Sequence, residues 1–213
     1  MEGLHLIYFT DAMCSWCWGF SPVIGALRAK YGDALPIRTV VGGLRPGTET
    51  PMDRSHLDGM RPHWEHVTEA SGQPFDYGFF DREGFIYDTD PAARAVVLAR
   101  REGPLMALDY LRAAQQAFYA QNRDVTQPAV LAELAGELGL DPTTFEANLH
   151  EDEVKQETWR DYAISQNAGV RGFPTLIAGP GAEGTFTLIT RGFNTAEAVL
   201  PMVDRWLKVT AVS

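Results

Sequence analysis

The stretch LHLIYFTDAMCSWC, residues 4–17, decides the fold of this chain. Its first half is a short apolar run, which predicts a central β-strand over residues 4–10 with both faces covered. Its second half carries Cys14 and Cys17, the only two cysteines of the chain, where a helix should begin. Backbone N–H groups at a helix start stabilise a thiolate, and two thiols at this spacing can interconvert between dithiol and disulfide. The stretch therefore predicts a strand, a tight turn and a redox site.

Within this pair, we expect Cys14 to be the exposed nucleophile and Cys17 the buried thiol that resolves a mixed disulfide. Inert buried thiols and a zinc site are the alternative interpretations. A zinc knuckle needs two further ligands, and only the five histidines of the chain could supply them. These histidines are His5, His56, His63, His66 and His150. We expect no metal site, and we expect His63 and His66 to share a solvated helix face.

Asp11 precedes Cys14 in the turn. We interpret it as a turn-forming aspartate, because a short carboxylate can accept hydrogen bonds from nearby backbone groups. A role as a hydrogen-bonding or proton-accepting group near the thiols is the alternative, and its charge would raise a neighbouring thiol pKa.

A helix should follow the turn and run from the cysteine motif to Lys30, because apolar side chains recur at helical spacing. Gly32 should end it. Pro22 lies inside this helix and cannot donate a backbone hydrogen bond, which predicts a kink. Residues 36–41, PIRTVV, predict a second strand rich in β-branched residues. Strand, helix and strand in this order predict a right-handed parallel unit.

From about Leu44 to Val170 helical periodicity replaces strand chemistry, which predicts an inserted helical domain. Asp90-Pro91 and Asp141-Pro142 each predict a capping carboxylate followed by proline at the first helical position. Two apolar stripes predict helices that pack together. The first consists of Leu105, Leu108, Leu111, Ala114 and Phe118, and the second of Val130, Leu131, Leu134 and Leu138 before Gly139. Gly59 and Pro62 interrupt the pattern from Met52 to Gly72, and residues 72–84 predict an aromatic-bearing loop.

Residue patterns typical of β-strands recur in the last third of the chain. Residues 175–178 and 185–190 predict two strands, with a turn over residues 179–184, and together they predict an antiparallel hairpin. Asn194 and Glu197 predict a capping box for a final helix. The expected buried face of that helix is Ala196, Leu200, Val203 and Leu207, and Pro201 should bend it. The predicted fold class is α/β.

Composition narrows the functional classes. The chain has 213 residues, of which 45% are hydrophobic and 22% charged, enough for one buried core with an insertion or for two small domains. The net charge of −10 argues against nucleic acid or an anionic membrane as a partner. No secretory leader and no transmembrane-length run is visible, so we expect a cytoplasmic protein. In a reducing cytosol a lone close-spaced cysteine pair indicates catalysis, redox sensing or metal binding.

The CSWC element at residues 14–17, the Phe173-Pro174-Thr175 stretch and the strand order resemble the DsbA-like branch of the thioredoxin superfamily. The local segment around the cysteines is similar to cytosolic DsbA-like oxidoreductases, although these usually carry Asp-Pro before the motif and this chain has Ala12. The resemblance spans nearly the whole chain. It implies a thioredoxin-like domain over residues 1–43 and 171–213 with a large inserted all-helical domain over residues 44–170.

The resemblance also implies a cis proline at Pro174 beside the nucleophile, with the preceding backbone open to an extended substrate. It gives Cys14, Cys17 and Pro174 as catalytic residues and Ser15, Trp16, Phe173 and Thr175 as substrate-binding residues. From the residues themselves, we expect Trp18 and Phe20 in the core and Trp16 and Phe173 at an apolar rim. Neither Ser15 nor Trp16 is cationic, which predicts a less extreme oxidant than relatives with histidine there.

We therefore expect a thiol-disulfide oxidoreductase that acts on protein, peptide or small-thiol substrates, with glutathione as a redox co-substrate and without a metal or organic cofactor. One alternative is a glutathione-dependent isomerase or kappa-class transferase, a group that typically has serine where Cys14 stands. Another is a non-catalytic redox sensor or chaperone-like binding module. The sequence leaves the direction of exchange and the oligomeric state open.

Overall fold

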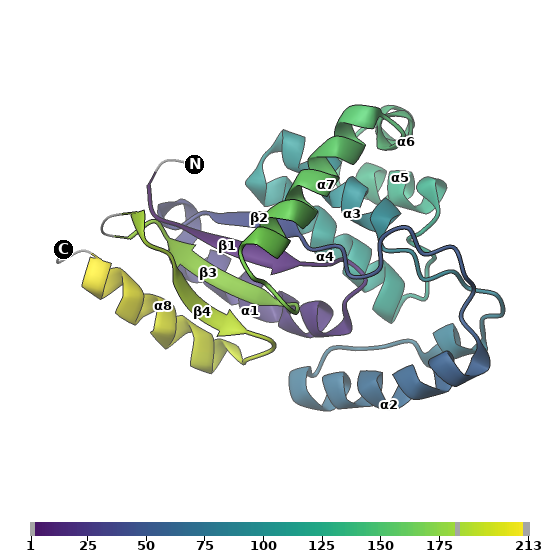
Figure 1. Cartoon of the computed structure of the whole chain (residues 1–213), viewed down its shortest axis with the longest axis horizontal. Coiled ribbons are helices and arrows are strands. Elements are labelled where there is room, and N and C mark those ends of the chain that lie inside the picture. The colour runs from purple at the N-terminus through teal and green to yellow at the C-terminus, as the bar shows by residue number, and fades with distance from the viewer. Residues whose placement is uncertain (1–2, 182–183, 211–213) are drawn as a thin grey trace.

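The computed structural model describes residues 3–181 and 184–210. Within that part of the chain, four strands form one sheet in the order β2-β1-β3-β4 (Figure 1). They are β1 His5–Thr10, β2 Ile37–Val41, β3 Thr175–Gly179 and β4 Thr187–Arg191. β2 runs parallel to β1, whereas β3 is antiparallel to both β1 and β4. The predicted parallel unit and the predicted hairpin are both confirmed.

The central strand β1 is covered on both faces, as its continuous apolar run predicts. Side chains of a strand alternate between the two faces, so Tyr8 and Thr10 share one face and Ile7 and Phe9 the other. The Tyr8 ring lies 5.9 Å from the Phe20 ring of the following helix, which identifies the face that this helix covers.

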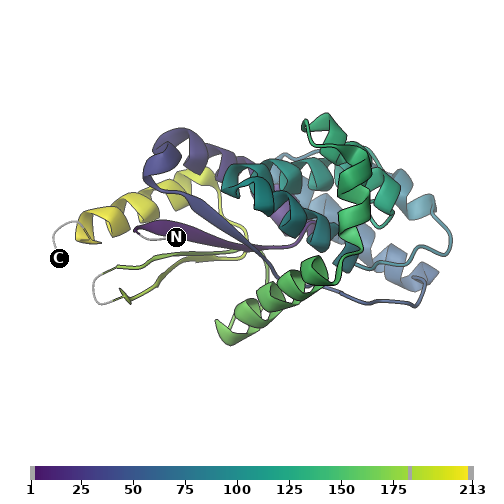
Figure 2. The ribbon, with the colours of Figure 1, turned by 90° about the horizontal axis from the view of Figure 1, so that it is seen from above.

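Helices cover both faces of the sheet. The helix α1, Ser15–Tyr31, and the final helix α8, Ala196–Thr210, lie on one face, and the C-terminal end of α7, Asp152–Asn167, lies on the other (Figure 2). α1 continues without interruption through Pro22, and Gly32 ends it with a φ of 52°. The start of α1 therefore lies at the end of β1, where the cysteines are.

The segment between β2 and β3 is helical among its described residues, as expected. Its helices gather beyond one side of the sheet (Figure 1). They are α2 Arg54–Ser71, α3 Asp90–Ala99, α4 Pro104–Ala120, α5 Pro128–Glu137, α6 Pro142–Leu149 and α7. Short 3-10 turns occur at Gly32–Ala34, Tyr77–Asp81 and Arg100–Glu102. The observed architecture is thus a thioredoxin-like fold with a helical insertion.

The helix α2 is continuous although Gly59 and Pro62 lie within it. Asp53 caps its start by accepting a hydrogen bond from the His56 N–H at 2.9 Å. Its buried Trp64 packs against aromatic rings from the segment predicted as a loop, with centroid distances of 4.8 Å to Phe80 and 4.9 Å to Phe79. Burial of large aromatic surface outweighs the local propensity of one glycine and one proline.

Two predicted helix starts are wrong by one residue. α3 is preceded by Thr89, so Asp90 is its first helical residue, where its carboxylate pairs with Arg94 instead of capping.

At α8 the Thr195 carbonyl accepts the first helical bonds, from Ala198 and Val199. Asn194, predicted as the cap, instead donates to the Thr190 hydroxyl at 2.6 Å. The predicted Asp141 cap of α6 is confirmed, because it accepts from the Thr144 N–H at 2.8 Å.

Two predicted apolar faces are shifted. Leu105, in the predicted α4 stripe, is 51% exposed because it lies in the first turn, beside a surface cavity. On α8 the fully buried residues are Val199, Val203 and Trp206, whereas the remaining predicted positions are half-buried. The turn of the hairpin falls partly on residues 182–183, which lie outside the described residues. None of the described helices is long and apolar enough to cross a membrane.

A buried ion pair joins the helical segment to the sheet. Asp161 of α7 is 2% exposed and accepts from both terminal nitrogens of Arg100, at 2.6 and 3.2 Å. It also accepts from the Val41 N–H at the end of β2, at 3.0 Å. Removing one partner of such a pair leaves an unpaired charge and an unsatisfied backbone donor.

We predict that Asp161→Ala lowers the free energy of unfolding by about 3 kcal/mol, because Arg100 is left without its counter-ion in a largely buried position. Denaturant unfolding measures this change. Glu157→Ala is the matched control, since Glu157 pairs with Arg101 at 2.9 Å on the surface and should cost less than about 1 kcal/mol. Equal costs for the two variants would contradict the assignment of Asp161 as a buried anchor.

Candidate active site

The turn between β1 and α1 places Cys14 at the helix cap. Its N–H donates to the Asp11 carbonyl at 3.3 Å, and its own carbonyl accepts the first helical bond from Trp18 at 3.0 Å. Cys14 has extended backbone angles, with φ −101° and ψ 116°, so its side chain leaves the helix axis at the N-terminal end. The unpaired N–H groups of the first turn are then available to a negative charge near Cys14.

A loop from the far end of the chain lies against this cap. The Cys14 sulfur is 3.6 Å from the carbonyl oxygen of Phe173, and the Phe173–Pro174 peptide bond is cis. Cys14 is only 7% exposed, so the expectation of an exposed Cys14 is wrong, whereas Cys17 is 0% exposed as predicted. Both thiols are free in this structure. Of the two cysteines, Cys14 is the more exposed.

The Phe173 ring lies against Gly42, directly after β2, where the backbone carries no side chain. A Cβ atom at Gly42 would come within 1.8 Å of the Phe173 ring, so any other residue there would displace the ring. Gly42 also donates its N–H to the Thr10 carbonyl at 2.8 Å. This glycine directly follows the predicted strand over residues 36–41, and the tertiary structure shows that it makes room for the proline loop.

Cys17 is enclosed by the end of β1. Burial raises the pKa of its thiol well above the ordinary value, and the neighbouring Cys14 raises that pKa further. The Thr10 hydroxyl and the Asp11 N–H act in the opposite direction. Cys17 therefore keeps its proton in the dithiol form.

Asp11 is fully buried, and its carboxylate joins the turn to the start of the helical segment. It accepts from the Met13 N–H at 2.9 Å and from the Leu44 N–H at 2.9 Å. Burial raises its pKa to about 6, against the effect of these two hydrogen bonds. The turn-forming interpretation is confirmed, and the carboxylate additionally carries a desolvation cost.

Side chains of the helical segment support the same turn. Tyr87 donates its hydroxyl to the Met13 carbonyl at 2.5 Å, and Gln115 of α4 reaches the Asp11 carbonyl at 3.5 Å. Sequence reasoning missed both residues, because each lies far along the chain in a segment read only for helical periodicity. The insertion thus fixes the backbone that carries the cysteines.

Trp16 lies between two parts of the chain. Its ring meets His63 and His66 of α2 edge to face, at 5.7 and 5.3 Å, and Phe193 of the loop after β4 at 5.5 Å. Trp16 and Phe173 are half-buried, as expected of a rim, whereas Trp18 and Phe20 are buried. His63 and His66 are exposed, as predicted, and their contact with Trp16 could not be foreseen from periodicity alone.

Ser15 and Thr175 are buried beside the site. Ser15 is the first residue of α1 and is 7% exposed. Thr175 is 2% exposed and donates its hydroxyl to the Gly172 carbonyl at 2.8 Å, so it shapes the loop around the cis proline. Within the described residues, no cluster of three or more His, Cys, Asp or Glu side chains could hold a metal ion.

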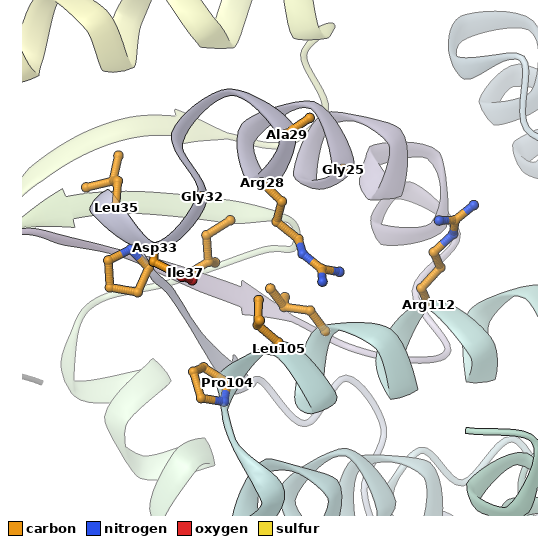
Figure 3. A pocket seen from close by; sticks show the side chains of 12 residues that line it. Gly25, Arg28, Ala29, Gly32, Asp33, Leu35, Ile37, Pro104, Leu105 and Arg112 are labelled. Atoms are coloured by element: carbon orange, nitrogen blue, oxygen red, sulfur yellow. The ribbon is translucent and has the colours of Figure 1, made fainter. Parts of the chain in front are cut away.

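Neither Cys14 nor Cys17 lines either of the two larger cavities among the described residues. One, of about 490 Å³, opens between α1 and α4, and Arg28 reaches into it from α1 (Figure 3). Arg28 is already paired with Asp109 at 2.5 Å, and both Arg112 and Asp33 line the cavity, so positive and negative charges balance there. The other, of about 480 Å³, lies on the opposite sheet face and is lined by Ile7, Phe9 and Ile177. The candidate site is therefore the thiol pair and its rim.

Comparison with known sequences identifies similar proteins. The sequence model of the DSBA-like thioredoxin domain matches residues 5–189. Among curated proteins, the ClpXP adapter protein SpxH is 24% identical in Halalkalibacterium halodurans and 26% in Bacillus subtilis, over 82% and 81% of this chain. The matches span only 58% and 57% of the lengths of these two relatives.

Comparison with solved structures gives closer matches. A candidate protein disulfide isomerase from Nitrosomonas europaea is 38% identical with a TM-score of 0.89, covering 98% of this chain and 99% of that one. The cytosolic disulfide reductase DsbM from Pseudomonas aeruginosa is 25% identical with a TM-score of 0.73, covering 96% of each chain. DsbM has also been solved with glutathione, and that structure is 26% identical and covers 98% of this chain and 100% of that one, with a TM-score of 0.73.

The raised pKa of Asp11 predicts a pH-dependent stability. Because the folded-state pKa of about 6 exceeds the unfolded value, this group contributes stability below pH 4 that is lost as the pH rises through about 6. The free energy of unfolding of the wild type, relative to Asp11→Asn, should fall by about 2 kcal/mol between pH 4 and pH 7. Urea unfolding at several pH values measures the difference. Parallel curves for the two proteins would show that Asp11 ionises normally in the folded state.

Proposed function

Because the chain belongs to the DSBA-like thioredoxin domain family, we propose that it is a thiol-disulfide oxidoreductase that acts through Cys14 and Cys17 on protein, peptide or small-thiol substrates. One observation carries the proposal. The Cys14 sulfur lies at a helix start, 3.6 Å from the carbonyl oxygen that precedes the cis proline, and Cys17 is buried one helical turn further. A nucleophilic thiol, a resolving thiol and an open backbone edge are what disulfide exchange needs.

In the reducing direction, the Cys14 thiolate attacks one sulfur of a substrate disulfide. A bond forms between Cys14 and that sulfur, the substrate disulfide breaks, and the other substrate sulfur leaves as a thiolate that takes a proton from water. Cys17 then loses its proton and attacks Cys14, which forms the Cys14–Cys17 disulfide and releases the second substrate thiolate. Two electrons pass from the enzyme dithiol to the substrate, and the oxidising direction is the reverse.

The contact between Cys14 and the proline loop supports the assignment of Pro174 and Phe173 to substrate docking. The Phe173 carbonyl faces the thiol, so an extended substrate segment would pair with the backbone of this loop while its sulfur meets Cys14. The half-buried rings of Trp16 and Phe193 lie at the same edge and suit apolar substrate side chains.

Glutathione is the redox co-substrate that we propose, since the similar DsbM structure contains it. No metal or organic cofactor takes part in the proposed exchange. The likeness to cytosolic DsbM also supports a cytoplasmic location. The absence of a cation at Ser15 and Trp16 favours a reduction potential nearer to that of thioredoxin, about −270 mV, than to that of DsbA, about −120 mV. A reduction potential in that range would make the protein a reductant of substrate disulfides.

The decisive experiment is equilibration of the protein with graded mixtures of reduced and oxidised glutathione, followed by quantification of the Cys14–Cys17 disulfide. We expect one reversible two-electron transition. Cys17→Ser should instead accumulate a mixed disulfide with glutathione at Cys14, because the resolving thiol is missing. Cys14→Ser is the matched control and should form neither species. A wild-type protein that shows no reversible disulfide under any ratio would refute the proposed function.

Substitution of Trp16 tests the substrate rim. We predict that Trp16→Ala lowers kcat/KM for an apolar peptide disulfide about tenfold, the loss expected from one buried aromatic contact, and changes kcat/KM for oxidised glutathione less than threefold. Steady-state kinetics with both substrates measures the ratio. Trp18→Phe, a change in the core beside the rim, is the control for general disturbance. Equal losses for both substrates in Trp16→Ala would place Trp16 in the machinery of exchange and not in substrate choice.

The curated relatives favour a second candidate, a protein-binding adapter that recognises its partner without turnover. They are named adapters of ClpXP, and this chain spans less than two thirds of their length. An adapter would bind its partner with unchanged affinity in the Cys14→Ser, Cys17→Ser double variant. An oxidoreductase would lose all exchange in that variant, so the two candidates separate in one assay.

A further inference from the structure

Two buried hydroxyl groups beneath the active site have no hydrogen-bond partner. Tyr8 is 1% exposed and Thr10 is 0% exposed, and among the described residues neither hydroxyl makes a hydrogen bond of good distance and angle, although both lie close enough to the Cys17 thiol to affect its pKa or to be affected by it. A buried hydroxyl without a partner carries a substantial desolvation cost. Buried polar groups are nearly always paired, so two such groups on one strand call for an explanation.

Both hydroxyls lie on the face of β1 that α1 covers. Tyr8 and Thr10 alternate with Ile7 and Phe9, and the Tyr8 ring packs 5.9 Å from Phe20 of α1. Cys17 lies in the first turn of the same helix and is fully buried. The Thr10 hydroxyl favours the charged form of Cys17, and the charge of Cys17 in turn raises the pKa of Tyr8. The two hydroxyls and the thiol therefore share one enclosed space.

The exchange reaction creates the missing acceptor. A neutral thiol is a weak acceptor, whereas a thiolate accepts strong, charge-assisted hydrogen bonds. Cys17 must become a thiolate before it can attack the mixed disulfide, and it must do so in a site where burial opposes its charge. Because burial raises the pKa of the Tyr8 phenol well above its ordinary value, Tyr8 keeps its own proton and stays a donor.

We propose that the hydroxyls of Tyr8 and Thr10 donate hydrogen bonds to Cys17 when it becomes a thiolate. These hydrogen bonds stabilise the thiolate while it resolves the mixed disulfide on Cys14. This inference rests on the proposed function. Tyr8 and Thr10 act through Cys17 and are positioning residues. The ionisable groups that face Cys17 are the Cys14 thiol from the same helix and the Tyr8 phenol from β1, and the nearby Asp11 offers its backbone N–H.

The step balances with water as the proton acceptor. The Cys17 S–H bond breaks and its proton passes to water, the thiolate sulfur forms a bond to the Cys14 sulfur, and the bond from Cys14 to the substrate sulfur breaks. The substrate leaves as a thiolate and takes a proton from solvent. A small recess of about 30 Å³ beside Tyr8, lined also by Ser21 and Gln115, has room for a water molecule. It shares Arg28 and Arg112 with the open cavity of Figure 3.

The test uses the full-length protein and the chromogenic disulfide dithiobis-nitrobenzoate in a stopped-flow instrument. Attack by Cys14 releases a first equivalent of coloured thiol, and resolution by Cys17 releases a second. In Tyr8→Phe and in Thr10→Val we expect the first phase to stay within twofold of the wild type. The second phase should slow about tenfold in each, the loss expected from one hydrogen bond to a charged group. Its pH midpoint should rise by about one unit, because the thiolate has lost a donor.

Two matched variants separate this role from a structural one. Thr10→Ser keeps the hydroxyl and should retain the wild-type second phase. Thr39→Val removes another buried, unpartnered hydroxyl, on the neighbouring strand β2, and should leave both phases unchanged. Thermal unfolding of every variant reports whether it is folded. Removal of an unpartnered hydroxyl should not lower the thermal stability of the fold. Slow resolution in a stable variant would therefore show that the hydroxyl stabilises the Cys17 thiolate.

The outcomes are distinguishable from failure of the proposed function. A second phase that is unchanged in both Tyr8→Phe and Thr10→Val would overturn the inference, as would equal slowing of both phases or loss of the second phase in Thr39→Val. A second phase that persists in Cys17→Ser, or a first phase that persists in Cys14→Ser, would instead overturn the proposed exchange mechanism itself.

Discussion

The approach of the proline loop to the start of α1 is the contact on which the candidate site depends. The Cys14 sulfur and the Phe173 carbonyl come from opposite ends of the chain and meet at 3.6 Å. Their meeting requires β3 to pair antiparallel with β1, so that the loop before β3 reaches the end of β1 that carries the cysteines. It also requires a residue without a side chain at Gly42, over which the Phe173 ring lies.

Polar groups buried under the helix cap give the site its chemical character. Asp11 holds the turn through two backbone donors at the cost of a carboxylate whose pKa is raised to about 6. Tyr87 and Gln115, both from the helical segment, hold the same turn from the other side. The insertion therefore supports the candidate site, and the position of the thiols depends on residues that a minimal sheet with two helices would lack.

The match to the DSBA-like thioredoxin domain covers residues 5–189, and the solved structures that resemble this chain include proteins described as a disulfide isomerase and a disulfide reductase. These descriptions cover the rearrangement of disulfides and their reduction. The direction is set by the relative stability of dithiol and disulfide, which depends on the few groups around each sulfur. In this chain the buried hydroxyls of Tyr8 and Thr10 lie close to the Cys17 thiol.

The sequence by itself determined the order of strands and helices, the cysteine pair at the start of a helix, and the parallel unit and hairpin, because periodicity and turn residues are local signals. It did not determine the burial of Cys14, the continuity of α2 around Trp64, or the role of Gly42. It also did not determine which distant side chains support the turn. These features arise from contacts between residues far apart in the chain, where burial of aromatic surface and pairing of buried polar groups outweigh local propensity. Only the tertiary structure decided them.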